Sequence, residues 1–113
     1  KLIEDALAIQ EAGAFAVVLE CIPAKLADMI TKKLDIPTIG IGAGAGCDGQ
    51  ILVYQDMLGL FSEYTPKFVK HFAELGGAVK EAFQAYDREV KAGSYPAPEH
   101  TFKIDDDVLE KLY

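Results

Sequence analysis

Three short apolar runs constrain the fold of this chain more than any other feature. They occupy residues 14–19, 37–42 and 51–54. Continuous apolar runs of this length, rich in Val and Ile, are typical of strands that are covered on both faces. Between the first two runs, residues 24–34 repeat apolar side chains with a helical period, which indicates a crossover helix. We therefore predict an α/β fold with a parallel sheet, whose strands lie at residues 14–20, 37–42 and 50–56.

Glu20 follows the first apolar run directly and is the first candidate for chemistry. In parallel α/β folds, functional sites gather at the carboxyl ends of the strands, where this residue would lie. A carboxylate on the rim of an apolar core can act as a general base. The alternative is structural, because Glu20 could equally cap the next helix or form a salt bridge at the rim.

Glycines alternate after the second run, and residues 40–45 loosely match the pattern G-x-G-x-x-G/A. The dinucleotide-binding fingerprint also requires a helix immediately after the glycines and an acid about 20 residues further on. Here a β-like run begins again at Ile51, and Asp56 comes too early. We favour a tight rim, where only glycine lets the backbone pass close to a ligand or loop. A dinucleotide-binding module remains an alternative that a helix directly after Gly44 would favour.

Alternation along the strands suggests an apolar wall near Glu20. If Ile41, Ile51 and Val53 point into the mouth of a barrel, they form this apolar wall beside the carboxylate of Glu20. Plain core packing is the alternative for each of them. We predict an Asx-type turn at Asp48, which lies between glycines.

The second half of the chain has apolar residues at helical spacing. Pro66 is expected to open a helix that carries Phe68, Val69, Phe72 and Leu75 and stops at residues 76–77. A second helix is predicted at residues 78–91, and a short third one after Asp105. We therefore divide the single segment 1–113 into residues 1–62, with the strands, and residues 63–113, with C-terminal helices and a tail.

A non-catalytic assembly domain is a further alternative for the function of this chain. A fully exposed and unpaired Glu20 would favour it.

Charge and composition argue against several kinds of partner and site. The 11 basic and 18 acidic residues give a net charge of −7, which argues against nucleic acid or an anionic membrane surface as partner. No apolar run approaches the roughly 20 residues that cross a bilayer. Cys21 and Cys47 are expected to be reduced, as in a cytoplasmic protein. His71 and His100 lack a second ligand at metal spacing, so we predict structural roles for both and no metal ligands in this chain.

The chain opens directly in a helical pattern at residues 2–12, without a starting methionine. Three parallel strands are also too few to close a barrel, which takes about eight. We therefore expect this chain to be the C-terminal part of a larger protein.

Several motifs, in order and with matching spacing, resemble the ketopantoate hydroxymethyltransferase family. The resemblance covers nearly the whole chain up to about residue 102. The motifs are Glu11-Ala12-Gly13-Ala14, Val18-Leu19-Glu20-Cys21-Ile22-Pro23, Ile36-Pro37-Thr38-Ile39-Gly40-Ile41-Gly42-Ala43-Gly44, Cys47-Asp48-Gly49-Gln50-Ile51-Leu52-Val53, Pro66-Lys67-Phe68, Tyr95-Pro96 and Glu99-His100-Thr101-Phe102.

The resemblance implies the last three strands of a TIM (β/α)8 barrel of the phosphoenolpyruvate mutase type. It implies transfer of a hydroxymethyl group from 5,10-methylenetetrahydrofolate to 3-methyl-2-oxobutanoate, giving ketopantoate for pantothenate and coenzyme A synthesis. Glu20 falls on the family's general base, and Ile41, Ile51 and Val53 could face the isopropyl end of the keto acid.

The same resemblance implies a cytoplasmic homo-oligomer, a decamer, whose Mg²⁺ chelates the keto acid. The metal ligands would lie on earlier strands outside this chain, so this segment alone is expected to be inactive.

Overall fold

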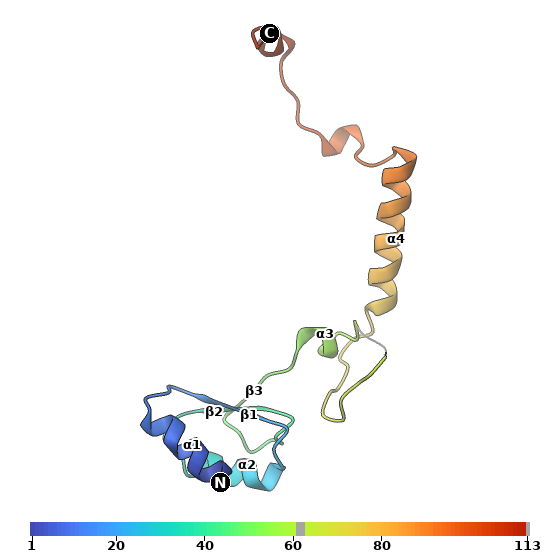
Figure 1. Cartoon of the computed structure of the whole chain (residues 1–113). Helices are drawn as coiled ribbons and strands as arrows, with labels where there is room; N and C mark the ends of the chain where they lie inside the picture. The colour runs from blue at the N-terminus through green and yellow to red at the C-terminus, as the bar shows by residue number, and fades with distance from the viewer. Residues whose placement is uncertain (61–62, 113) are drawn as a thin grey trace. The chain divides into compact units, whose positions relative to one another are not determined.

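The computed structural model describes residues 1–60 and 63–112, and the chain forms two units, Lys1–Gly76 and Gly77–Tyr113. The predicted division after residue 62 falls at residues 61 and 62, which lie outside the described residues. The elements run in the order α1 (Leu2–Glu11), β1 (Val17–Glu20), α2 (Ala24–Thr31), β2 (Thr38–Ile41), β3 (Gly49–Gln50), α3 (Tyr54–Met57), α4 (Gly76–Ala92), the 3-10 helix η1 (Pro98–His100) and α5 (Asp106–Leu109) (Figure 1).

The sheet confirms the predicted parallel α/β architecture. Its three strands lie in the order β1-β2-β3, and both neighbouring pairs are parallel. Glu20 pairs in register with Ile41, so β1 and β2 end together. The helices α1 and α2 lie on one side of this sheet (Figure 1).

The core of the first unit forms between the sheet and these two helices. Leu19 of β1 is 4% exposed and packs with Ala27 and Ile30 of α2. Ala6 of α1 and a small residue after β2, Ala43, complete the cluster. Val18 points to the opposite face, because successive strand residues alternate, and it is 54% exposed. The prediction that both faces are covered is therefore met on one face only within the part of the chain described.

The third strand is much shorter than the predicted 50–56. β3 contains only Gly49 and Gln50, and a short helix, α3, follows at Tyr54–Met57. The physical reason lies in β2, its partner. Gly42 has a φ of 66° and turns the chain away directly after β2, so β3 has almost no partner strand beyond Gln50.

The predicted helix after Pro66 is wrong. Residues 70–75 run without helical structure beside residues 57–59. The Phe72 N–H donates to the Met57 carbonyl at 2.8 Å, and the Leu75 N–H donates to the Leu58 carbonyl at 2.9 Å. The Lys70 ammonium lies 4.9 Å from the centre of the Phe72 ring, a contact between alternate residues that suits an extended chain.

The second unit is built on one long helix. The predicted helix at residues 78–91 is confirmed within α4, and Gly93 ends it with a φ of 71°. α5 confirms the short helix after Asp105. Within the described residues, no helix is both long and apolar enough to cross a membrane. None of the residues of α4 is buried in the described chain, although the helix carries an apolar stripe that includes Val79, Ala82, Phe83, Tyr86 and Val90.

Candidate functional site

The carboxyl end of the sheet brings two of the predicted site residues, Glu20 and Ile41, together. Glu20 is the last residue of β1, and its partner Ile41 is the last residue of β2. Partners in register on parallel strands share a face, so both side chains start from the same side of the sheet. Residues 42–46, with their three glycines, follow Ile41 at this same end, as the sequence predicts.

Glu20 is exposed, and its carboxylate makes no hydrogen bond or ion pair with any residue in 1–60 or 63–112. The chain turns directly after it. Cys21 has a φ of 53°, in the left-handed region that costs a non-glycine residue about 1–2 kcal/mol. Its N–H donates to the Ile41 carbonyl at 2.9 Å, which holds the turn against β2. Residues in such sparsely populated backbone conformations cluster at functional sites.

The segment 42–46 is a tight rim, as expected from its glycines. A Cβ on Gly42 would lie 2.8 Å from the ring of Phe68, and one on Gly44 would overlap with Ala24. Both glycines also have positive φ, at 66° and 78°. Residues 45 and 46 form a turn, and the next regular element is β3 rather than a helix. The dinucleotide-binding alternative required a helix there, and the structure does not provide it.

A depression of about 1050 Å³ opens at this end of the sheet and extends along β3 to Asp48, which contacts Thr38 at the start of β2. Its wall contains residues 21–24 after β1, three residues of the glycine segment, residues 47–50, and the side chains of Lys67 and Phe68. Neither Glu20 nor Ile41 lines the depression, but the residues that follow them, Cys21 and Gly42, both do.

The three predicted wall residues are not equally placed. Ile41 is buried at 9% exposure beside the glycine segment. Ile51 is half exposed, lines a second depression of about 410 Å³, and donates its N–H to the Gly40 carbonyl at 3.0 Å. Val53 is half exposed and precedes α3. The structure therefore groups Ile41 and Ile51 near the end of β2, whereas Val53 lies further along the chain.

The histidines have local partners. His71 Nδ1 lies 2.7 Å from a Glu74 carboxylate oxygen, although it lies outside any helix, contrary to the prediction. His100 Nδ1 accepts the Ala97 N–H at 3.0 Å. Both cysteines are free thiols. Across residues 1–60 and 63–112, no group of three His, Cys, Asp or Glu side chains could hold a metal ion.

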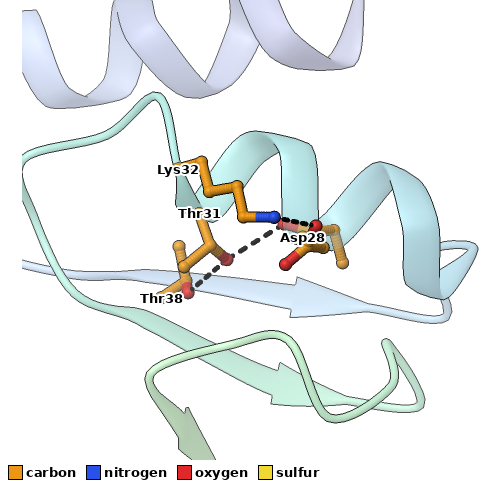
Figure 2. Close-up of polar contacts among 5 residues, drawn as sticks. Asp28, Thr31, Lys32 and Thr38 are labelled. Carbon is orange, nitrogen blue, oxygen red and sulfur yellow. Dashed lines mark hydrogen bonds and ion pairs between the residues drawn. The ribbon is translucent and has the colours of Figure 1, made fainter.

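The opposite, amino end of the sheet is closed by polar contacts. Thr38 is fully buried at the start of β2, and its hydroxyl lies 2.8 Å from that of Thr31 on α2 (Figure 2). Asp48 Oδ2 accepts the Thr38 N–H at 2.8 Å and the Thr38 hydroxyl at 3.1 Å. The prediction of an Asx-type turn at Asp48 is therefore wrong, because this carboxylate reaches across to β2.

Sequence reasoning missed Lys67 and Phe68 as site residues. The only signal was the short motif Pro66-Lys67-Phe68, whose spacing was interpreted as the start of a helix. A turn replaces that helix, with the Val69 N–H donating to the Pro66 carbonyl at 2.9 Å, and it places both side chains in the wall of the larger depression.

Comparison with known proteins adds independent findings. The family model described as ketopantoate hydroxymethyltransferase matches residues 1–98. The chain is 69% identical to the 3-methyl-2-oxobutanoate hydroxymethyltransferase of Clostridium novyi (strain NT) and 66% identical to that of Enterococcus faecalis (strain ATCC 700802 / V583). A third protein of this name, from Clostridium botulinum (strain Alaska E43 / Type E3), is 62% identical. Each match covers all 113 residues of this chain but only 41% of the relative.

Proposed function

The chain belongs to the ketopantoate hydroxymethyltransferase family, and we propose that it supplies the C-terminal part of an enzyme of pantothenate biosynthesis. This enzyme transfers a hydroxymethyl group from 5,10-methylenetetrahydrofolate to 3-methyl-2-oxobutanoate and gives ketopantoate. The observation that carries the proposal is similarity over the whole chain to relatives that bear this enzyme's name. Because the chain spans 41% of those relatives, the activity is proposed for the whole enzyme and not for this segment alone.

We propose that the three parallel strands are the last three of a TIM (β/α)8 barrel of the phosphoenolpyruvate mutase type. The exposed face of the sheet supports this proposal. Val18 and Glu20 lie on that face, opposite the side covered by α1 and α2. In a closed barrel, the uncovered face becomes the interior, which the remaining strands complete. Residues 63–113 would then follow the barrel as C-terminal helices and a tail.

Glu20 is proposed as the general base. Its carboxylate takes the proton from carbon 3 of the keto acid, and the electron pair of that bond forms an enolate. Water breaks the two C–N bonds of the donor's methylene carbon, so its two protons go to the nitrogens of the released tetrahydrofolate and its oxygen stays on the carbon as formaldehyde. Carbon 3 then attacks this one-carbon unit, and the proton on Glu20 passes to its oxygen, which gives the hydroxymethyl group. The position of Glu20 supports this role, because a base must be within reach of the substrate and Glu20 is exposed at the carboxyl end of β1.

The apolar end of the keto acid is proposed to lie against Ile41 and Ile51, with Val53 as the outer part of the same wall. Ile41 supports this best, since it pairs with Glu20 on one face of the sheet. An isopropyl group placed there would have its carbon 3 beside the carboxylate.

Magnesium is expected in the whole enzyme, where it would stabilise the oxyanion of the enolate. The described residues of this chain do not form a site for it. We therefore propose that the ligands lie on the other barrel strands, and the steps above use only groups of this chain.

The proposed enzyme is a cytoplasmic homo-oligomer, a decamer in its family. The apolar stripe of α4 supports an assembly role, since Phe83 and Tyr86 are more than half exposed in this chain. Light scattering on the intact enzyme tests this, and a monomer would contradict it.

One observation favours the alternative of a non-catalytic assembly domain. Glu20 is exposed and unpaired within the described residues, which is what a surface residue without function would show. The same exposure is required of a base that meets a substrate, so the two roles are separated only by activity.

The activity test uses the full-length enzyme that contains this segment. Incubation with 3-methyl-2-oxobutanoate and donor labelled with ¹³C in its methylene group should give ketopantoate with ¹³C in the hydroxymethyl group, detected by NMR. Omitting either substrate is the control. If the labelled carbon never appears in ketopantoate, the proposed reaction is wrong.

A further inference from the structure

We propose that the larger depression at the carboxyl end of the sheet binds the folate donor, with Lys67 holding the carboxylates of its glutamate part. This inference rests on the proposed function and deepens it, because it assigns the second substrate to residues of this chain. Its main residues are Lys67, Phe68 and the glycine segment 42–46.

The size of the depression exceeds the needs of a short keto acid. Its volume of about 1050 Å³ is slightly larger than the roughly 300–1,000 Å³ of pockets that hold a drug-sized ligand. The reaction uses one small substrate and one large one. Tetrahydrofolate, with its pterin, aminobenzoyl and glutamate parts, is the large substrate and fits such a volume.

The depression also lies where the donor must be. Carbon 3 of the keto acid attacks the one-carbon unit that the donor releases, so the two substrates must lie side by side. Cys21 and Gly42 line the depression, and they directly follow Glu20 and Ile41. The donor site would therefore adjoin the base and the proposed keto-acid wall.

The wall of the larger depression carries a positive charge and N–H groups, which suit an anionic ligand with several hydrogen-bond acceptors. Lys67 is its basic side chain, and this ammonium makes no ion pair with residues 1–60 or 63–112. Gly44, Ala45 and Cys47 also line the depression, and their N–H groups donate no backbone hydrogen bond within the described residues. Asp48 is the acid of the wall, and its Oδ2 is already bound by the N–H and hydroxyl of Thr38. The glutamate carboxylates and the pterin carbonyl supply the matching acceptors.

Phe68 supplies an aromatic surface for a flat ring. Its side chain lies over Gly42, is 37% exposed, and lines both the larger and the smaller depression. An aromatic ring at this boundary can stack on the pterin and hold its methylene carbon toward the keto acid.

The test measures the donor and the keto acid separately in the full-length enzyme. Lys67→Ala should raise KM for 5,10-methylenetetrahydrofolate about three- to tenfold, a range that allows for the exposure of Lys67. KM for 3-methyl-2-oxobutanoate should stay unchanged, and so should exchange of its carbon-3 proton into heavy water without donor. Lys67→Arg should restore most of the donor affinity. Lys33→Ala is the matched control, because Lys33 is an exposed lysine just after the end of α2. It should change neither KM.

A second donor makes the assignment specific. 5,10-Methylenetetrahydropteroate lacks the glutamate, so the wild-type enzyme should bind it more weakly than the natural donor. In Lys67→Ala, the two donors should have the same KM. If Lys67→Ala leaves the donor KM unchanged, raises both substrate KM values equally, or still distinguishes the two donors as wild type does, the inference is wrong.

Failure of the proposed function gives a different result. If wild type makes no ketopantoate, calorimetry with tetrahydrofolate still decides the inference. Weaker binding by Lys67→Ala than by wild type would support it, and equal or absent binding would overturn it.

Discussion

The two ends of the sheet differ in how completely their polar groups are satisfied. At the amino end, the buried Thr38 hydroxyl lies between Thr31 and Asp48, and each contact is within 3.2 Å. At the carboxyl end, Glu20 is exposed without a partner in the described chain, and Cys21 has a left-handed backbone.

This difference separates the residues that hold the fold from those proposed to do chemistry. A buried hydroxyl with several partners contributes to stability, because leaving any of them unsatisfied is costly. An exposed carboxylate contributes little to stability and is free to meet a substrate. The same division is found in (β/α)8 barrels, where the carboxyl face carries function and the amino face carries stability.

The largest loss of stability is expected at the amino end. Thr38→Val keeps the branched shape but removes the hydroxyl, so the Asp48 N–H loses its acceptor and Thr31 loses a partner. We expect the free energy of unfolding of the full-length enzyme to fall by about 2–3 kcal/mol. Urea denaturation measures this, with Thr38→Ser as the control that retains the hydroxyl. Equal stability of the Val and Ser variants would show that these hydrogen bonds do not hold this end.

A smaller loss is expected at the turn after Glu20. Cys21→Val places a β-branched residue at a φ of 53°, which should lower the free energy of unfolding by about 1–2 kcal/mol. Cys21→Gly relieves the same strain and should stay within about 1 kcal/mol of wild type. The two variants are compared by denaturation under the same conditions. A Val variant as stable as the Gly variant would mean that this turn is not strained.

The smallest effect is expected from an exposed pair next to Thr31. Lys32 Nζ lies 2.6 Å from Asp28 Oδ2 on the surface of α2, with the two side chains 72% and 42% exposed (Figure 2). Lys32→Ala should cost about 0.3–0.5 kcal/mol, since solvent screens such pairs. Thermal denaturation at low and high salt measures it. A loss as large as that of Thr38→Val would show that burial is not what distinguishes the amino end.

Much of this arrangement could be predicted from local patterns. The apolar runs predicted parallel strands, and the position of Glu20 after the first run predicted its place at the carboxyl end. Both are confirmed by the register of β1 and β2. The helical periods of residues 2–12 and 78–91 predicted α1 and α4, because those helices depend mainly on the spacing of their own residues.

The rest depended on contacts that spacing does not encode. The apolar residues after Gln50 read as a strand, but β2 ends at Ile41, so a longer β3 has no partner there. Phe68, Val69, Phe72 and Leu75 have helical spacing, yet residues 72–75 have no helical structure, and backbone hydrogen bonds join Phe72 and Leu75 to residues 57 and 58.

The candidate site was predicted only in part for the same reason. The position of Glu20 at the carboxyl end of β1 was predicted because strand ends can be recognised from sequence, whereas its role as a base stays a prediction. The place of Lys67 in the wall of the larger depression depends on contacts between separate segments of the chain. So do the hydrogen bonds between Asp48 and Thr38, which are 10 residues apart. The local sequence predicts neither contact, because the motif Pro66-Lys67-Phe68 is equally typical of the start of a helix.

Exchange of the carbon-3 proton of 3-methyl-2-oxobutanoate into heavy water, followed by NMR without the folate donor, tests the proposed chemistry most directly. The full-length Glu20→Gln enzyme keeps the shape of the side chain but loses the basic oxygen. We predict that its exchange rate at saturating keto acid falls about 10²–10⁴-fold, with keto-acid affinity and stability close to wild type. Glu11→Gln changes an exposed acid, the last residue of α1; it is the control and should exchange at the wild-type rate. A Glu20→Gln enzyme that exchanges the proton as fast as wild type, or one that only binds the keto acid more weakly, would contradict the assignment of Glu20 as the base.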